Sequence, residues 1–520
     1  MKRFGLIAAI LAVPSIADAF CGFYVAGSGE KLFNDATQVV LMRQGTRTVL
    51  AMQNHYQGPA GEFAMIVPVP VVLQEADVKT LPDEVFDKVD QMGAPRLVEY
   101  WEIDPCFQER DHDEGKVAMS PTMDMASAGS SAGGSMGVTI EAKFDVGEYK
   151  ILILSAKDST GLDTWLRAEK YQIPKDAEPL LRPYVEQGMK FFVAKVDPQK
   201  VKFENDANGT PRVELSPLRF HYDSEEFALP IRLGLANSSG TQDLIVNILA
   251  PMKRYEVSNY KNVTIPTNID LDAKMKTKFP AFYTALFDRT IEKNPGAVIT
   301  EYAWDAATCD PCPGPNLDMS DFATLGADVL GGTREQPTPY QSSDFVLTRL
   351  HARYGKTITN DLVFKETHPI SGGREHTINQ QGKLEEGAQK SDYNNFQARY
   401  AIRYPWTGPI ACDAPVRGRW GGPPDNQQSS PTPATKLAFA PRGEVELPTV
   451  IKTDIPELGL KAASKTIAAG GGFDPRPGVK KKGCGCAASD SGGLLFGGLV
   501  FAFALRRRRP ASRARTLKAQ

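Results

Sequence analysis

The chain has 520 residues, of which 42% are hydrophobic, and its formal net charge is −2 at pH 7. A chain of this length can bury sizeable cores in two or three domains. Basic residues cluster only near the C-terminus. Because no basic stripe interleaved with aromatic residues is present, the composition argues against a nucleic-acid partner.

The first 19 residues have the features of a secretory signal peptide. Lys2 and Arg3 precede an apolar segment from Phe4 to Val13, and an Ala-Asp-Ala sequence closes the segment. A charged start, a short apolar run and small residues at the end are typical of a cleaved signal. We therefore predict cleavage between Ala19 and Phe20, followed by export of the mature chain.

Cys21 raises the alternative of a lipoprotein signal, in which an acylated cysteine begins the mature chain. Such a signal needs a small residue immediately before the cysteine, whereas Phe20 stands there. We therefore expect Cys21 to be the second residue of a mature chain that begins at Phe20.

Residues 20–260 predict a β-rich first unit in which helices are inserted between strands. Gln44 and Gly45 separate two short β-runs and indicate a hairpin turn. Pro68 and Pro70 interrupt a third run, which should therefore lie at a sheet edge or leave the sheet there. Residues 111–137 are polar or small, which favours a mobile loop. The predicted strands are 37–42, 47–54, 62–72, 97–103, 148–155, 190–203, 214–222, 229–235 and 242–249, and the predicted helices are 81–90, 161–170 and 178–187.

Residues 270–416 predict a second β-rich unit. It contains a helix over 282–292 and a strand over 297–304. Residues 345–356 and 396–404 alternate apolar with basic side chains, which is typical of strands with one solvent-exposed face. The fold class is therefore α+β and β-rich, in two mixed sheet-and-helix units. Residues 417–483, rich in Gly, Pro, Ser and Gln, should follow as a disordered stalk, and a short hydrophobic helix should end the chain.

The body of the chain resembles a known family. The segments that carry the resemblance are Cys21–Val25, Thr48–Leu50, Phe63–Pro70, Asp163–Trp165, Tyr171–Pro174 and Phe191–Val196. They are similar to domain-of-unknown-function family 2330, over about residues 20–406. The resemblance implies an exported bacterial protein, and it brings no catalytic residues with it.

Four cysteines lie in the body of the chain. In an exported protein an even set favours disulfides, and four cysteines allow three connectivities. Two of them form a Cys-x-x-Cys sequence, for which a redox dithiol and, with His368 and His376, a zinc site are alternatives. Pro313 follows closely and opposes the helix that a redox motif needs. We therefore predict structural disulfides, with open connectivity, among Cys106, Cys309, Cys312 and Cys412.

Other motifs give little support for catalysis. Residues 133–137 match the G-x-S-x-G pattern of serine hydrolases, but a strand is expected after them where that motif needs a helix. Residues 27–31 lack the ending of a phosphate-binding loop, and residues 104–114 lack the ligand order of a calcium loop. We therefore predict no catalytic, cofactor-binding or metal-binding residue.

The C-terminal tail contains three pieces in succession. Cys484 and Cys486 precede an apolar run that ends at Leu505, and Arg506, Arg507, Arg508 and Arg509 follow. Residues 491–505 would span about 22 Å as a helix, whereas a bilayer core is about 30 Å thick. Positive charge stays in the cytoplasm, so the arginines should stop export. One interpretation is a plain single-span anchor. The other, which we favour, is a processed tail in which Cys484 or Cys486 is lipid-modified.

Residues 484–509 resemble the MYXO-CTERM sorting signal in having Cys-Gly-Cys, a Gly/Leu/Phe-rich run and an arginine cluster. That resemblance implies export, cleavage near the cysteine and attachment at the cell surface through lipid. This chain departs from the pattern in continuing from Pro510 to Gln520 and in offering two cysteines.

The sequence thus predicts a cell-surface or outer-membrane protein, with release into the medium after tail processing as a variant. Its expected partners are the membrane, the export and sorting machinery, and an unknown surface ligand. The leading hypothesis is a structural, adhesive or binding ectodomain; the alternative is a hydrolase acting on an extracellular polymer. A hydrolase should show a deep polar pocket, whereas a binding module should show an exposed apolar patch or an open strand edge.

Overall fold

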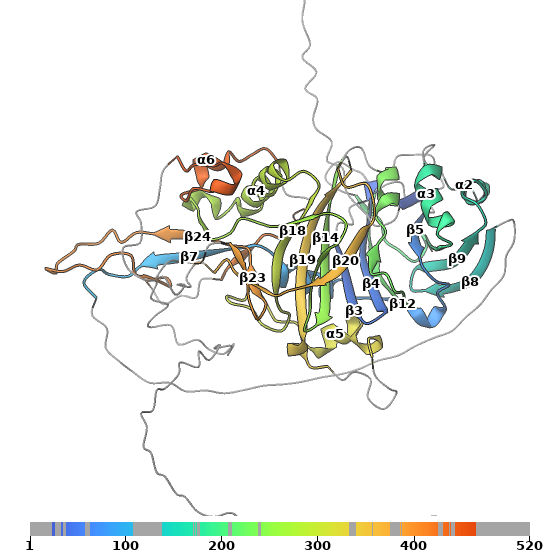
Figure 1. Ribbon diagram of the computed structural model, residues 1–520, viewed down its shortest axis with the longest axis horizontal. Helices are drawn as coiled ribbons and strands as arrows, with labels where there is room; N and C mark the ends of the chain where they lie inside the picture. The colour runs from blue at the N-terminus through green and yellow to red at the C-terminus, as the bar shows by residue number, and fades with distance from the viewer. Residues whose placement is uncertain are drawn as a thin grey trace, which may run out of the picture. The chain divides into compact units, whose positions relative to one another are not determined.

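Strands dominate the computed structural model, whose described residues form four β-sheets flanked by short helices (Figure 1). The prediction of a β-rich α+β fold is therefore confirmed. The structure describes residues 23–26, 33–34, 38–57, 63–107, 138–169, 171, 173, 177–205, 211–237, 241–331, 340–355, 357–374, 385, 387–424, 430–435, 437 and 442–463.

The first sheet is antiparallel and has helices on one face and the large sheet on the other. Because both faces are covered, every residue of its strand β5 is buried, and the strand has a continuous apolar sequence. The strand order is β1 (Phe23–Ala26), β5 (Phe63–Val69), β10 (Lys190–Val196), β9 (Tyr149–Ala156) and β8 (Val138–Val146).

The helices on this sheet follow from local sequence. In α2 (Ser159–Ala168), the Asp158 side chain accepts a hydrogen bond from the Gly161 N–H at 2.6 Å and caps the N-terminus. Its buried residues Leu162, Trp165 and Leu166 repeat at helical spacing. The helix α3 (Glu178–Glu186) closely matches its predicted range. Both predicted helices are therefore confirmed.

The large sheet contains thirteen strands among the described residues. Its β3–β4 hairpin turns at Gly45, whose φ of 56° is a conformation that glycine adopts without strain. The main order is β11 (Glu204–Asn205), β12 (Pro211–Asp223), β4 (Arg47–Gln57), β3 (Gln38–Gln44), β14 (Gln242–Pro251), β19 (Phe345–Tyr354), β18 (Ala297–Asp305), β23 (Asn395–Gln397), β21 (Ile370–Gly372) and β22 (Ala388–Lys390), with β2 (Phe33–Asn34), β6 (Val78–Thr80) and β16 (Lys261–Thr264) off this path.

The predicted boundary between two units is not present in this sheet. Strand β14, from the first predicted unit, pairs in parallel with β3 and antiparallel with β19, which comes from the second predicted unit. Residues 20–260 and 270–416 therefore share one continuous sheet. The boundary prediction is wrong because backbone pairing between distant strands leaves no local mark in composition.

Two small sheets complete the strands. One contains β13 (Ala228–Leu229), β20 (Leu362–Thr367) and β15 (Arg254–Val257), and the other contains β17 (Ile269–Asp270), β24 (Arg399–Tyr404), β7 (Arg96–Glu102), β25 (Trp420–Gly421) and β26 (Thr432–Pro433). In the latter, β7 and β24 pair in parallel although about 300 residues separate them: the register joins Arg96 to Arg399 and Trp101 to Tyr404.

Helices on the large sheet pack in two groups. The longest, α4 (Phe279–Lys293), packs with β24, β18 and the short α6 (Leu447–Val450). The helices α1 (Glu84–Gly93) and α5 (Met319–Leu325) pack in a separate core with β3, β4 and β19. The short 3₁₀ helices are η1 (Glu75–Asp77), η2 (Arg232–Asn237), η3 (Ala273–Met275), η4 (Ala327–Val329), η5 (Ser342–Asp344) and η7 (Pro456–Leu458).

The core around α4 corrects the prediction of a stalk over residues 417–483. Trp420, Leu447, Val450, Ile451 and Leu458 are each at most 7% exposed. The described part of this range therefore packs on the body of the protein. Its few apolar residues are enough because most of them pack against the core around α4, some fully buried and others, such as Val445 and Leu460, partly buried.

Several sequence predictions lie outside the described residues. They are the signal peptide with Ala19 and Phe20, the whole loop over 111–137, the stalk beyond residue 463, and the tail with Cys484, Cys486 and Arg506, Arg507, Arg508 and Arg509. Within the described ranges, none of the helices has the length and apolar character needed to cross a bilayer.

The four body cysteines form two disulfides. Cys106 bonds to Cys412 across a sequence separation of 306 residues, and Cys309 bonds to Cys312 across a separation of 3. A cross-link restricts the unfolded chain more strongly when it closes a longer loop. The prediction of disulfides is confirmed, and the structure resolves the connectivity that the sequence left open.

The two disulfides should therefore differ in their effect on stability. We expect Cys106→Ala with Cys412→Ala to lower the free energy of unfolding by roughly 2–5 kcal/mol, and Cys309→Ala with Cys312→Ala to lower it by less than about 2 kcal/mol. Urea unfolding of the two double variants without reductant measures the difference. Equal losses would contradict the loop-closure argument.

Candidate functional site

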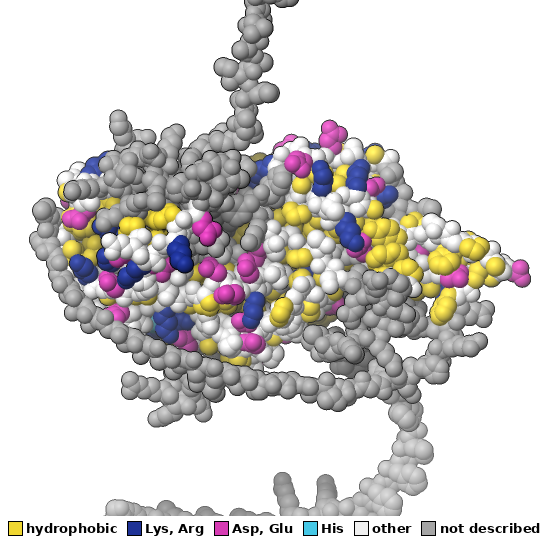
Figure 2. Space-filling view, turned by 180° about the vertical axis from the view of Figure 1, so that it is seen from behind, with side chains coloured by type: hydrophobic (Ala, Val, Ile, Leu, Met, Phe, Trp, Pro, Cys, Tyr) yellow, Lys and Arg dark blue, Asp and Glu magenta, His cyan; other side chains and the backbone are white. Residues whose placement is uncertain are grey.

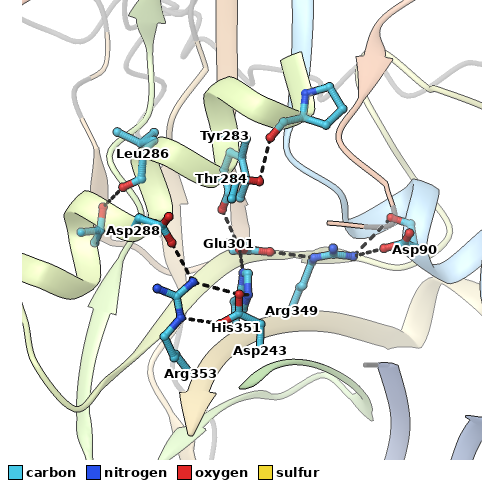
Figure 3. Close-up of polar contacts among 12 residues, drawn as sticks. Asp90, Asp243, Tyr283, Thr284, Leu286, Asp288, Glu301, Arg349, His351 and Arg353 are labelled. Atoms are coloured by element: carbon cyan, nitrogen blue, oxygen red, sulfur yellow. Dashed lines mark hydrogen bonds and ion pairs between the residues drawn. The ribbon is translucent and has the colours of Figure 1, made fainter. Parts of the chain in front are cut away.

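A charged cluster lies between α4, α1 and the large sheet (Figure 3). Its centre is the Glu301 carboxylate on β18. One oxygen accepts hydrogen bonds from the Tyr283 hydroxyl at 2.6 Å and lies 2.7 Å from Nδ1 of His351. The other lies 2.8 Å from Nε of Arg349, whose Nη1 contacts Asp90 at 2.6 Å. Glu301 therefore connects one strand to two helices and the neighbouring strand β19.

The cluster continues toward the surface through a second carboxylate, Asp243 on β14. Arg353 donates two hydrogen bonds to Asp243, at 2.7 and 2.9 Å, and a third to Asp288 at 2.7 Å. Arg442 also contacts Asp243 and Asp288. The imidazole of His351 stacks on Phe287, with ring centroids 3.6 Å apart. Carboxylates and cations thus alternate from the core to the edge of α4.

The alternation of side chains along β19 brings these cations together. Arg349, His351 and Arg353 occupy every second position, so they share one face of the strand. The alternation of apolar and basic residues over 345–356 predicted a solvent-exposed face for these side chains. That prediction is wrong, because Arg349 is 0% exposed and His351 3% exposed, and α4 covers them.

Electrostatics within the cluster favour the ionised carboxylates. Burial raises the pKa of Glu301, but the charges and hydrogen bonds of His351 and Arg349 outweigh burial and hold that pKa at about 2. For Asp243, burial likewise raises the pKa, and Arg353, with further positive charge nearby, lowers it below its usual range. Each buried negative charge is therefore compensated by cations.

The cluster is closed to a substrate. Glu301 is 0% exposed, and Tyr283, Arg349 and Asp90 occupy its surroundings. A carboxylate that orients a histidine is an arrangement used in acid–base catalysis, but here Glu301 is 0% exposed and His351, stacked on Phe287, is 3% exposed, so neither group faces a substrate. The arrangement fastens α4 and α1 to the sheet, so its role is structural.

Removing Arg349 should be costly because it leaves two buried carboxylates without their cation. We expect Arg349→Met to lower the free energy of unfolding by about 3–5 kcal/mol. The matched control is Arg47→Met, since Arg47 pairs with Asp223 at 2.8 Å on the surface with side chains 33% and 55% exposed, where the loss should stay below about 1 kcal/mol. Urea unfolding at neutral pH compares the two, and a loss no larger than the control's would refute a stabilising network.

The depressed pKa of Glu301 predicts a specific dependence of stability on pH. Its contribution should be complete above the ordinary value of 4.5 and should disappear as the pH falls toward about 2, because only the unfolded chain binds the proton in that window. Glu301→Gln should therefore lose stability at pH 6 and show a shallower decline between pH 5 and 3, by up to about 1.4 kcal/mol per pH unit. Chemical unfolding at each pH measures this slope.

The control for that experiment is Glu366→Gln. Glu366 pairs with Lys253 on the surface, with side chains 53% and 50% exposed. Its replacement should leave the slope nearly unchanged. Parallel slopes for wild type and Glu301→Gln would show that Glu301 does not titrate as expected.

A second feature is the arm, which we define as residues 103–107 and 405–419. These segments continue from β7 and β24, which run side by side in Figure 1. The Cys106–Cys412 disulfide joins them, and the Ile103 N–H donates to the Arg419 carbonyl at 2.8 Å. The Val416 N–H donates to the Pro105 carbonyl at 2.9 Å. The two segments therefore form one cross-linked unit.

Glu102 holds the base of the arm. Its carboxylate accepts two hydrogen bonds from Arg417, at 2.9 and 2.8 Å, one from the Gly418 N–H at 2.7 Å and one from the Trp406 N–H at 2.8 Å. The side chain is only 3% exposed. One buried carboxylate therefore accepts four hydrogen bonds from the arm, and these bonds hold the arm in a defined conformation.

The arm exposes apolar side chains. Phe107 is 45% exposed, Ile410 45% and Val416 49%, and they are three of the five large hydrophobic residues that the described part of the chain exposes. Figure 2 shows hydrophobic side chains gathered over the arm, at the right of the view. We call Phe107, Ile410 and Val416 the arm patch. Because hydrophobic side chains gather over one ordered element (Figure 2), the arm is a candidate interaction surface.

The remaining sequence candidates give no catalytic or metal site among the described residues. Cys309 and Cys312 bond to each other, so the thiolate pair that a zinc site needs is absent from this structure. No cluster of three metal-ligating side chains occurs in the described ranges. Residues 133–137, which match the hydrolase pattern, and His376 lie outside those ranges.

Sequence reasoning missed both the charged cluster and the arm patch. The signal for the cluster was present in the spacing of Arg349, His351 and Arg353, but its carboxylate partners come from distant elements. The arm patch had no signal, since Phe107 and Ile410 are single apolar residues in polar, proline-containing segments.

The fold and these surfaces define a β-rich α+β protein with two disulfides and an exposed, cross-linked arm. The chain belongs to the family of uncharacterized proteins conserved in bacteria called DUF2330, whose model matches residues 15–365. The match includes β7, Cys106 and the charged residues on β18 and β19; β24 and Cys412 follow it in the chain. No curated protein and no solved structure shows a significant match.

Proposed function

We propose that this chain is an exported bacterial envelope protein, anchored at the cell surface, whose ectodomain binds a partner protein through the arm patch. The observation that carries the proposal is the exposure of Phe107, Ile410 and Val416 on an element ordered by a disulfide and by Glu102. An apolar surface held in one conformation loses little entropy on binding.

The carboxylates on the arm favour a protein over a hydrocarbon surface as partner. Asp413 is exposed between Ile410 and Val416 in the sequence, and Asp104 lies on the other segment. A carboxylate inserted into hydrocarbon is costly. A protein interface, by contrast, combines an apolar centre with a polar rim.

Three features support the location in the envelope. The signal-like residues 1–19 predict export, with cleavage between Ala19 and Phe20. Two disulfides fit an oxidising compartment outside the cytoplasm. The tail resembles the MYXO-CTERM signal, so we infer that lipid on Cys484 or Cys486 anchors the chain, with Arg506–Arg509 as the cytoplasmic stop.

The alternative of a polymer hydrolase receives no support from the charged cluster. Its Glu301 carboxylate lies within hydrogen-bonding distance of His351, but both groups are enclosed. A binding or adhesive role is therefore the function that the geometry favours.

A photoreactive residue in place of an arm-patch side chain tests this proposal in the producing bacterium. We expect full-length protein with Ile410→p-benzoylphenylalanine to form a discrete cross-link to one envelope protein on illumination of intact cells. The control is Met252→p-benzoylphenylalanine, because Met252 is 73% exposed but belongs to the β14–β15 turn and not to the arm. Gel electrophoresis and peptide mass spectrometry identify the product.

The cross-link should disappear when Val416→Asp is added to the Ile410 variant. Equal cross-linking from both positions, or none from Ile410, would overturn the role of the arm patch. The recovered chain also reports location: it should begin at Phe20 and end in a lipid-modified cysteine, whereas retention of residues 494–520 would contradict tail processing.

A further inference from the structure

A cleft of about 450 Å³ lies on a part of the molecule that shares no residue with the arm. Its walls come from the end of β5, the residues after α3, the end of β12, β13, η2 and the start of β20. This volume is in the range of small-ligand sites. The polar groups that line it include Ser224, Glu226, Arg232, Asn259 and Asn360.

Arg232 is held in the cleft wall by Asp361. The Asp361 carboxylate accepts hydrogen bonds from the Tyr184 hydroxyl at 2.6 Å and from the backbone N–H groups of Ile231 and Arg232 at 2.9 and 3.3 Å. It lies 3.8 Å from Nε of Arg232, which is too far for a hydrogen bond. The guanidinium carbon of Arg232 lies 5.9 Å from the centre of the Tyr184 ring. Asp361 thus orients Arg232 without accepting a hydrogen bond from its guanidinium N–H groups.

The guanidinium keeps unused hydrogen-bonding capacity. Nε of Arg232 is buried and has no hydrogen-bond partner, and no acceptor for its terminal nitrogens is found among the described residues. A buried donor without an acceptor is unfavourable until a ligand supplies one. The planar fork of arginine matches the two oxygens of a carboxylate.

The rest of the cleft combines an apolar floor with a polar rim. Pro68, Pro230 and Tyr222 are buried and line it, while Gln187 and Asn360 are exposed at its edge. Flat apolar surfaces suit the faces of a sugar ring, and side-chain amides both donate to and accept from hydroxyl groups. Asn259 bridges the Val363 N–H and the Asp361 carbonyl, which fixes the rim segment.

Two other ligand classes fit the cleft less well. An extended peptide would add to the edge of β5, where β1 pairs only as far as Ile66 among the described residues. Pro68 and Pro70 lack the N–H groups that such a strand requires there. A phosphate carries about two negative charges at pH 7, but Arg232 is the one cation among the described lining residues and Glu226 lines the same cleft.

We propose that this cleft binds a carboxylate-bearing saccharide, a uronic acid residue of an extracellular polysaccharide. Arg232 binds the carboxylate, the sugar ring packs on the apolar floor, and the amides of Gln187 and Asn360 form hydrogen bonds with the hydroxyl groups. The site would give an envelope protein a second contact besides its protein partner.

Calorimetric titration of the purified full-length protein with a galacturonate dimer tests the proposal. We expect a Kd between roughly 10 μM and 1 mM, and binding of the neutral galactose dimer weaker by at least about tenfold. Arg232→Gln should weaken galacturonate binding by at least about tenfold. The matched control is Arg182→Gln, since Arg182 makes an exposed ion pair with Glu178 at 2.7 Å outside the cleft; it should leave the Kd unchanged.

A second variant keeps Arg232 and the fold. Asn360→Asp adds a negative charge at the exposed rim and should weaken binding of galacturonate more than that of the neutral dimer. The proposal is overturned if galacturonate does not bind at about 1 mM, if inorganic phosphate or the neutral dimer binds as tightly, or if Arg232→Gln binds like wild type. Circular dichroism of each variant verifies that the protein is folded.

Discussion

One carboxylate, that of Glu301, connects elements from widely separated parts of the chain. It lies on β18, contacts Arg349 and His351 on β19 and accepts a hydrogen bond from Tyr283 on α4, while Arg349 extends the network to Asp90 on α1. A charge that is 0% exposed is tolerated only when its partners are all in place. The position of α4 and α1 on the large sheet therefore depends on this group.

The same principle recurs at the two surfaces that carry the proposed binding. Glu102, 3% exposed, gathers four donors and orders the arm. Asp361 gathers the Tyr184 hydroxyl and two backbone N–H groups and orients Arg232 in the cleft. In each case a carboxylate with its hydrogen bonds made inside the protein positions groups that are available for binding. On the arm these groups are apolar side chains, and in the cleft the group is the guanidinium of Arg232. Both surfaces are pre-organised, which is what a binding protein needs to limit its entropic cost.

Strand pairing explains why the arm and the charged cluster belong to one folded unit. Strand β14 inserts between β3 and β19, and β7 pairs with β24 from the other end of the body. The Cys106–Cys412 disulfide then links those ends across 306 residues. Residues that were expected to extend as a stalk, such as Trp420 and Leu447, instead bury themselves against this assembly.

The sequence by itself determined features that depend on neighbours in the chain. Helix α2 follows from its Asp158 cap and its apolar spacing, the β3–β4 hairpin follows from Gly45, and the even set of cysteines predicted disulfides. Only the tertiary structure decided the burial, pairing and exposure of residues whose partners are distant in the sequence. It showed that Arg349 and His351 of β19 are buried and Arg353 is partly buried, because their partners Asp90, Asp243 and Glu301 lie on other elements. It also decided which cysteines pair and that Phe107 and Ile410 are exposed on one cross-linked arm, since neither strand register nor burial is encoded within a local stretch of residues.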